Sequence, residues 1–427
     1  MRDQSVFGES TQKWLLNDMA INQADRRILR EFAKKVLDLS RRPIEAEKKK
    51  LWLSHNKLNP TRPLIFCDPE NGWNEIIPEE DLHCSSELAR TWENHLRKEI
   101  FWGEQMGDDR VIESFFNVYY SYEDSGWGLH ETQIKHEEQG SYNWIPALAE
   151  YEEFSKLKFP VITVDHETTG RIRQLAEETF GDILNVRLKG QWWWSIGLTY
   201  VLVNLRGLEQ CMLDMYDYPM ELHRLMAFLR DGFLAKLDFL ETNGLLSLNN
   251  DETYVGSGGF GFTDELPAKD FAGKVRTKDM WGFLESQETV SVSPGMFEEY
   301  VYTYQLPILE RFGLNCYGCC EPLDQRWHIV EKTPNLRRVS VSPWSNLACM
   351  SENLNSKYIF SMKVNPSSLA VKNMDEGAVR KEIRDAFTIT RDNRVEAIMK
   401  DNHTLGGGPD NAIRWCRIAR EEAGAID

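Results

Sequence analysis

The 427-residue sequence lacks any long apolar run and any excess of positive charge. No stretch approaches the roughly 18 consecutive apolar residues of a transmembrane helix, and the opening segment, MRDQSVFGESTQKW, is polar where a secretory signal needs an apolar core. We therefore expect a soluble, cytoplasmic protein. Its 50 Lys and Arg residues against 67 Asp and Glu give a formal net charge of −17. This charge argues against nucleic acid and anionic membranes as partners.

Cysteine is also scarce, with eight residues in the whole chain. Five of them stand apart, and only Cys316, Cys319 and Cys320 cluster. A disulfide scaffold is therefore not expected, and the cluster is better interpreted as a metal site or a reactive thiol. The sequence has no internal repeat and no Gly-x-Gly-x-x-Gly directly after a predicted strand. The Gly-rich run over residues 256–261 has no helix signal behind it, so we interpret it as a flexible active-site loop and not as a phosphate cradle.

The C-terminal half alternates short β-rich runs with helical patterns. Strands are predicted over residues 245–248, 314–319, 338–341, 357–364 and 395–399, and helices over residues 218–243, 294–313, 346–354, 375–390 and 411–423. Such alternation is typical of a parallel sheet with crossover helices. Further strands are predicted over residues 160–165 and 184–188, with weaker ones over residues 63–67 and 115–120.

These segments make about eight strands, a number that favours a closed (β/α)₈ barrel. The alternative is an open, Rossmann-like sheet. We predict an α/β protein in which residues 1–60 form an N-terminal helical extension and residues 61–427 form the barrel. In such barrels the active site lies at the carboxyl ends of the strands.

Polar side chains that follow predicted strands are the candidates for that site. Asp251 and Glu252 form the best carboxylate pair for proton transfer, although a solvated loop explains them equally well. His166, Trp193, Asn250 and Lys363 are the candidates for substrate contacts. The run Trp192-Trp193-Trp194 offers indole walls on which a flat or cationic compound would stack, although at least one of these rings is expected to serve only packing.

The strongest local signal is the segment Asn315-Cys-Tyr-Gly-Cys-Cys-Glu-Pro. Cys316 and Cys319 fall on opposite faces of a strand, which weakens a redox interpretation of their Cys-x-x-Cys spacing. Zinc with one open coordination position is a better hypothesis, with Cys319, Cys320 and Glu321 as ligands and His403 supplying nitrogen from another strand end. The alternative is that the cysteines are small buried hydrophobes.

Several segments resemble the uroporphyrinogen decarboxylase superfamily, which includes zinc-dependent methyltransferases that work with corrinoid proteins. The resemblance covers roughly residues 180–425 and lies in Met280-Trp-Gly-Phe-Leu-Glu, Ser293-Pro-Gly-Met-Phe-Glu-Glu-Tyr, Leu314-Asn-Cys-Tyr-Gly-Cys-Cys-Glu, Val339-Ser-Val-Ser and Met362-Lys-Val-Asn-Pro. It implies a (β/α)₈ barrel and matches Cys319 to a zinc ligand. Tyr317 stands where the methyltransferases have His, and His403 lies where they have Cys.

The resemblance leads to three hypotheses about function. The first is a zinc-dependent methyltransferase that moves a methyl group from a small O- or N-methyl substrate to a corrinoid carried by a partner protein, or to a similar acceptor. The second is a metal-free decarboxylase of the uroporphyrinogen type, although residues 62–73 lack the paired arginines that grip a porphyrinogen in that branch. The third is a non-catalytic barrel subunit of a larger complex.

Overall fold

The computed structural model describes residues 19–129, 132–135 and 142–425. The opening segment MRDQSVFGESTQKW, on which the absence of a secretory signal was predicted, therefore lies outside the described residues. None of the described helices is long and apolar enough to cross a membrane.

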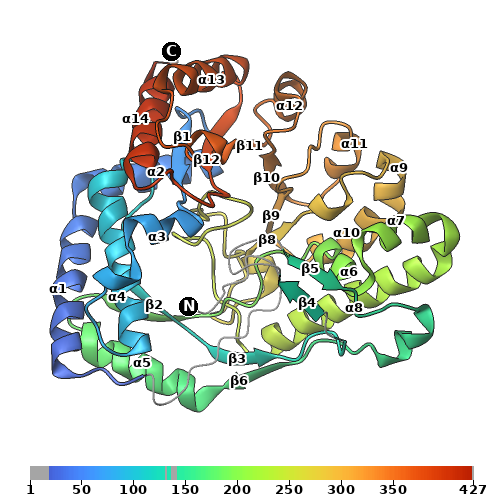
Figure 1. Cartoon of the computed structure of the whole chain (residues 1–427), viewed down its shortest axis with the longest axis horizontal. Coiled ribbons are helices and arrows are strands. Elements are labelled where there is room, and N and C mark those ends of the chain that lie inside the picture. The colour runs from blue at the N-terminus through green and yellow to red at the C-terminus, as the bar shows by residue number, and fades with distance from the viewer. Residues whose placement is uncertain (1–18, 130–131, 136–141, 426–427) are drawn as a thin grey trace.

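The described residues form twelve strands in a mixed α/β architecture (Figure 1). They are β1 (Leu64–Cys67), β2 (Phe115–Tyr119), β3 (Ser121–Asp124), β4 (Thr132–Lys135), β5 (Tyr142–Ile145), β6 (Ile162–Asp165), β7 (Asn185–Lys189), β8 (Trp281–Leu284), β9 (Leu314–Tyr317), β10 (Leu336–Val341), β11 (Ile359–Val364) and β12 (Arg394–Met399).

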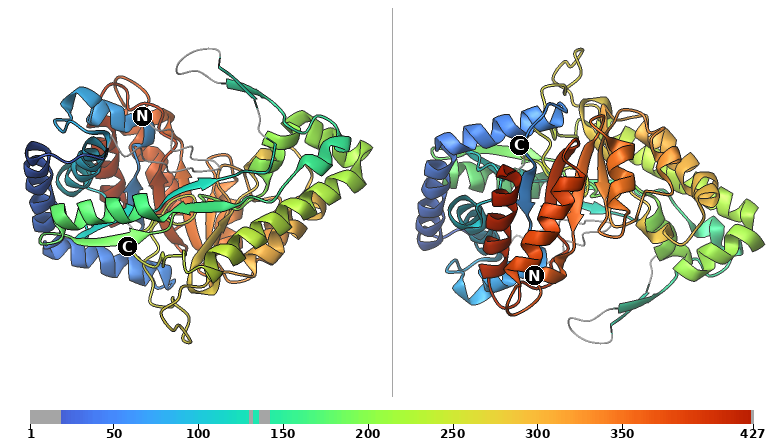
Figure 2. Two further views of the ribbon diagram at one scale, coloured as in Figure 1. Left: turned by 90° about the horizontal axis from the view of Figure 1, so that it is seen from below. Right: turned by 90° about the horizontal axis from the view of Figure 1, so that it is seen from above.

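The main sheet is parallel and has six strands in the order β1-β12-β11-β10-β9-β8. Its strands follow an arc in Figure 1, with α11 to α14 on the outer side. The other strands form three separate pairs, of which β2-β7 is parallel and β3-β6 and β4-β5 are antiparallel. In Figure 2 the β4-β5 hairpin stands out from the body of the molecule.

The described strands therefore do not join into one closed, hydrogen-bonded barrel, contrary to the prediction. The predicted strand over residues 245–248 is absent because side chains, and not a backbone ladder, connect this segment to its neighbour. The Trp192 indole donates to the Leu245 carbonyl at 3.0 Å, and Ser247 Oγ accepts from the Gly190 amide at 2.8 Å. The predicted strand at residues 160–165 forms as β6 but pairs antiparallel with β3, outside the main sheet.

Fourteen α-helices accompany the strands in the described part of the chain. They are α1 (Gln23–Ser40), α2 (Pro43–Asn56), α3 (Trp73–Ile76), α4 (Glu87–Phe101), α5 (His166–Phe180), α6 (Thr199–Arg206), α7 (Leu208–Asp217), α8 (Pro219–Thr242), α9 (Pro294–Phe297), α10 (Thr303–Leu309), α11 (Trp327–Val330), α12 (Leu347–Leu354), α13 (Glu376–Ile389) and α14 (Asp410–Gly424). The described part of the first 60 residues holds α1 and α2, and Trp52 of α2 belongs to the same core cluster as the main sheet.

The inner face of the main sheet carries an unusual polar layer. Side chains alternate along each strand, so Val339, Phe360 and Val395 share the apolar face while Arg338, Ser361 and Glu396 share the other. Arg338 and Glu396 are fully buried, and Arg338 Nε lies 2.9 Å from Glu396 Oε1. The buried charge of each residue is thus compensated by the other.

The Gly-rich run is packed against this polar face, and the prediction of a flexible loop is wrong. Every residue from 255 to 263 is buried, and Tyr254 and Phe260 form a short antiparallel bridge. A Cβ on Gly258, which has φ +132°, would lie 2.6 Å from Ile398 Cγ2. The missing side chains therefore let this hairpin approach the sheet closely.

Candidate active site

A pocket lies beyond the carboxyl ends of β7 and β8. It encloses about 560 Å³ of empty space, including open solvent at its mouth. The side chains on its walls that bear on the chemistry are Trp127, Trp192, Trp193, Trp194, Phe233, Lys236 and Glu285. All three members of the predicted tryptophan run therefore line one pocket. Trp192 is buried and its indole bonds to Leu245, whereas Trp193 and Trp194 are half-buried.

Glu285 supplies one of two carboxyl groups in the pocket lining, and the other, Asp124, is paired with Lys236. Glu285 is the first residue after β8, and its side chain is buried. Ser195 donates to its Oε1 at 3.2 Å, and the Gln287 amide donates to its Oε2 at 3.0 Å. A Cβ on Gly197 would lie 2.5 Å from Glu285 Oε1, so glycine at this position leaves room for the carboxyl group.

The pKa of Glu285 is raised well above its ordinary value. Burial is the main cause, and the neighbouring Glu288 and Glu321 carboxylates and the Cys319 thiol add to it. Among the described residues, no Lys, Arg or His nitrogen lies within 4.0 Å of the carboxyl oxygens of Glu285, Glu288 or Glu321. Burial among other acids without a nearby counter-charge favours the protonated form of a carboxyl group, although the Gln287 amide opposes this shift. Glu285 is therefore the candidate proton donor of the pocket.

Two adjacent thiols lie behind the Trp194 wall, at the carboxyl end of β9. The Cys319 and Cys320 sulfurs are 3.6 Å apart, and Ser257 of the Gly-rich hairpin donates to Cys319 Sγ at 3.1 Å. Lys400, which follows β12, donates to Ser257 Oγ at 3.2 Å, and its Nζ lies 5.6 Å from the centre of the Trp194 ring. Trp194 packs against the apolar cluster that contains Cys319. The Trp194 indole therefore lines the pocket and also packs against the cluster that contains Cys319.

The four predicted zinc ligands are not gathered in this arrangement. Glu321 uses its carboxylate to accept from the Ser286 amide at 2.8 Å and the Cys319 amide at 2.9 Å, and so ties two strand ends together. His403 is exposed, and its Nδ1 lies 3.4 Å from Asn71 Nδ2. Across residues 19–129, 132–135 and 142–425, no group of three or more His, Cys, Asp or Glu side chains could hold a metal ion. The residues present do not fit the predicted zinc site.

The predicted acid–base pair has a different role in the structure. Asp251 lies 2.8 Å from Lys189 Nζ and 3.1 Å from Arg187 Nη1, and Glu252 also pairs with Arg187. Burial alone would raise the pKa of Asp251, but Lys189, Thr253 and Arg187 outweigh it and lower the pKa. Asp251 is therefore a paired carboxylate outside the pocket lining, and it is not poised to exchange protons at neutral pH.

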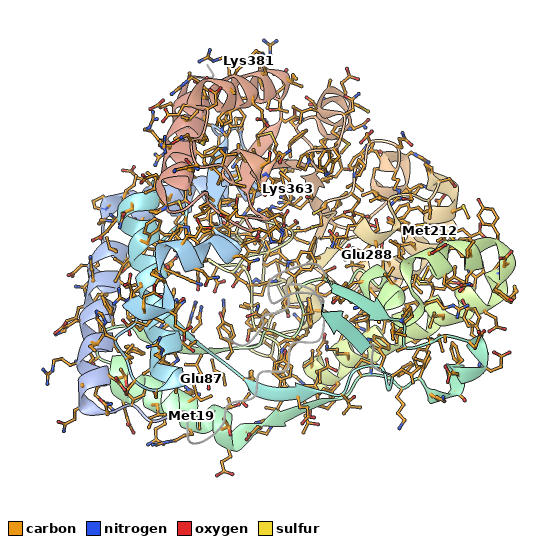
Figure 3. The ribbon with its side chains drawn as sticks, in the orientation of Figure 1. Met19, Glu87, Met212, Glu288, Lys363 and Lys381 are labelled. Carbon is orange, nitrogen blue, oxygen red and sulfur yellow. The ribbon has the colours of Figure 1, made fainter. Side chains whose placement is uncertain are left out.

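Of the predicted substrate contacts, only Trp193 lines the pocket. His166 is exposed at the start of α5, and Asn250 donates to the Leu266 carbonyl at 2.7 Å as a structural bond. Lys363 is buried on β11 and donates to Ser361 Oγ at 2.6 Å. Burial and the neighbouring Lys400 and Arg338 charges lower the pKa of Lys363 to about 8, although Glu396 and Cys319 oppose this shift. In Figure 3 Lys363 and Glu288 both lie toward the middle of the molecule, whereas Lys381 lies at its outer edge.

Sequence reasoning missed Glu285, Ser257 and Lys400. The signal for Glu285 was present, because Trp281-Gly-Phe-Leu is a short apolar run and Glu285 is the first polar residue after it. A strand assigned there would have placed Glu285 at the rim with the other candidates. Ser257 lies in the Gly-rich run that was expected at the active site, but no sequence signal marks its contact with Cys319, because that contact depends on how the Gly-rich hairpin folds back onto the sheet.

Comparisons with known proteins do not assign the chain to a family. No family model matches it, and no curated protein does. Among solved structures, a methyltransferase from Methanosarcina mazei is similar, with 10% sequence identity and a TM-score of 0.47 over 88% of this chain and 98% of that chain.

Proposed function

We propose that this protein transfers a methyl group from a small methylated compound bound in the tryptophan-lined pocket. The observation that carries the proposal is Glu285, a buried carboxyl group that lines the pocket together with four indole rings. The pocket supplies apolar, flat surfaces for the substrate and one acidic proton for the reaction.

The chemistry of methyl transfer explains why such a proton matters. When a nucleophile takes the methyl carbon, the bond between carbon and heteroatom breaks, and the heteroatom keeps the electron pair. An ether oxygen then leaves as an anion, which is a poor leaving group unless an acid protonates it. Glu285 is positioned to donate that proton, with Ser195 and the Gln287 amide fixing its carboxyl group.

The need for a proton on the leaving group distinguishes the O-methyl substrates from the N-methyl substrates of the methyltransferase hypothesis. A quaternary methylamine leaves as a neutral amine and needs no proton, whereas a methyl ether does need one. The pocket also offers no carboxylate that is free to balance a cation, because burial favours the neutral form of Glu285 and Asp124 lies 2.6 Å from Lys236 Nζ. The proposal therefore favours O-methyl over N-methyl substrates.

The acceptor in this proposal is a corrinoid protein or a similar nucleophile, as the family resemblance implies. No step is assigned to zinc, since the predicted ligands are not gathered. The decarboxylase alternative needs a cationic pocket to stabilise a carbanion. Lys363 and Lys400 do not line this pocket, and the lysine that does, Lys236, is paired with Asp124 at 2.6 Å.

A substrate survey tests the proposal. The purified protein is incubated with a corrinoid acceptor and either aromatic methyl ethers or methylated amines, and demethylated product is measured. We expect turnover of an ether, and at least a tenfold lower kcat/KM in Trp193→Ala, because the variant loses one wall of the pocket. Trp344→Ala removes a 73% exposed indole outside the pocket and serves as the matched control. Turnover restricted to methylated amines, or equal rates in both variants, would contradict the proposal.

A further inference from the structure

The adjacent thiols of Cys319 and Cys320 have a chemistry that the proposed function does not use. We propose that they form a reversible redox site, which a low-molecular-weight disulfide closes to a vicinal disulfide. This proposal rests on the geometry of the pair and does not depend on methyl transfer.

The backbone holds the two sulfurs together. Gly318, with φ +90°, turns the chain directly before them. The carbonyl of Cys319 accepts from Ser340 Oγ at 3.0 Å, and the carbonyl of Cys320 accepts from Ser342 Oγ at 2.7 Å. Both residues are thereby anchored to the end of β10, and their sulfurs lie 3.6 Å apart. Cys316 does not compete for either thiol, since it lies upstream on β9 with its sulfur 3.8 Å from Arg338 Nη1.

The two thiols differ in exposure, and this difference assigns their order of reaction. Cys320 is half-buried, whereas Cys319 is only 1% exposed. Cys320 therefore attacks the small disulfide first, which forms a mixed disulfide and releases one small thiol. Cys319 then attacks the Cys320 sulfur and releases the second small thiol. Two protein thiols and one disulfide become one protein disulfide and two small thiols, so protons and electrons balance.

The product would be labile, as a regulatory disulfide must be. The Cα atoms of consecutive residues are about 3.8 Å apart across a trans peptide, below the roughly 4.4–6.8 Å that ordinary disulfides span. The closed form is therefore strained, and a dithiol reduces it readily. Closure would also change the surroundings of Cys319 Sγ, which accepts from Ser257 and belongs to the apolar cluster against which Trp194 packs.

Peptide mapping by mass spectrometry tests the proposal directly. The whole protein is treated with glutathione disulfide, and the tryptic peptide over residues 312–326, which holds Cys316, Cys319 and Cys320, is weighed. We expect the loss of two hydrogen masses, reversed by dithiothreitol. Cys319→Ser should stop at a stable glutathione adduct on Cys320, and Cys320→Ser should take up no glutathione. Cys316→Ser, the matched control, should close as the wild type does.

A second measurement uses the unmodified protein. Phenylarsine oxide bridges two neighbouring thiols, so one equivalent should bind to the reduced wild type and block disulfide closure. A wild-type peptide that keeps both hydrogens under glutathione disulfide, or a Cys320→Ser variant that oxidises as the wild type does, would overturn the proposal.

Discussion

The buried ion pair between Arg338 and Glu396 gives the sharpest prediction about stability. The change is Glu396→Gln, which removes the carboxylate and leaves the Arg338 guanidinium uncompensated in the interior. Breaking a buried pair on one side costs about 3–5 kcal/mol. We therefore expect the free energy of unfolding to fall by about that amount, and much more than the typical surface substitution.

The lowered pKa of Glu396 gives a similar value for the stabilisation that its carboxylate provides. Burial alone would raise its pKa, but Arg338 and His55 outweigh this effect and lower the pKa to about 2. Against an unfolded value of about 4.3, this shift corresponds to about 3 kcal/mol at neutral pH. The folded pKa is depressed, so this stabilisation is present above the unfolded pKa and is lost as the pH falls from about 5 toward 2.

Urea unfolding followed by tryptophan fluorescence measures both effects. Glu376→Gln is the matched control, because its pair with Arg417 is exposed (46% and 40% for the Arg and Glu side chains) and such pairs contribute about 0–1 kcal/mol. The double variant Arg338→Met/Glu396→Met should recover much of the loss, since neither charge remains buried. A Glu396→Gln variant as stable as the Glu376→Gln control would refute the reasoning.

Two further substitutions test the packing around the pocket and the hairpin. Gly197→Ala places a Cβ 2.5 Å from both Glu285 Oε1 and the Glu285 backbone carbonyl oxygen, so we expect the rate of methyl transfer to fall at least tenfold and the free energy of unfolding to fall by about 1–3 kcal/mol. An unchanged rate in a substrate-turnover assay would show that the Glu285 carboxyl position does not matter. Gly258→Ala places a Cβ 2.6 Å from Ile398 Cγ2 at a residue with φ +132°. We therefore expect the free energy of unfolding, measured with urea, to fall by about 1–3 kcal/mol. Gly273→Ala, at φ +96° with open space around the residue, should lose less stability because only backbone strain remains.

The main sheet was predictable from sequence because its strands are regular. The predicted strands at residues 338–341, 357–364 and 395–399 correspond to β10, β11 and β12, and the helices that follow are α12, α13 and α14. Each apolar run there is bounded by polar or turn residues, so local pattern and final structure agree. The segment at residues 245–248 has the same pattern but does not pair, because the neighbouring Trp192 and Gly190 reach it through side-chain bonds.

The site was predictable only in part. The rule that site residues follow strands identified the Trp192-Trp194 run and the Cys319-Cys320 pair, because the carboxyl ends of parallel strands lie at one edge of the sheet. The same rule could not tell that Asp251 is paired with Lys189, or that Glu321 is taken up by backbone amides. Lys189 and Ser286 are far from Asp251 and Glu321 in the sequence, so no local pattern predicts these contacts.

The pH dependence of methyl transfer in wild type and Glu285→Gln tests the central claim most directly. The account predicts that wild-type kcat falls as the pH rises through the raised pKa of Glu285, because the general acid is then lost. Glu285→Gln should be slower by about 10²–10⁴-fold with methyl ethers, should lack this falling limb, and should lose most with the poorest leaving groups. Glu209→Gln, on the exposed surface of α7, is the control. A Glu285→Gln enzyme with the wild-type rate and pH profile would contradict the account.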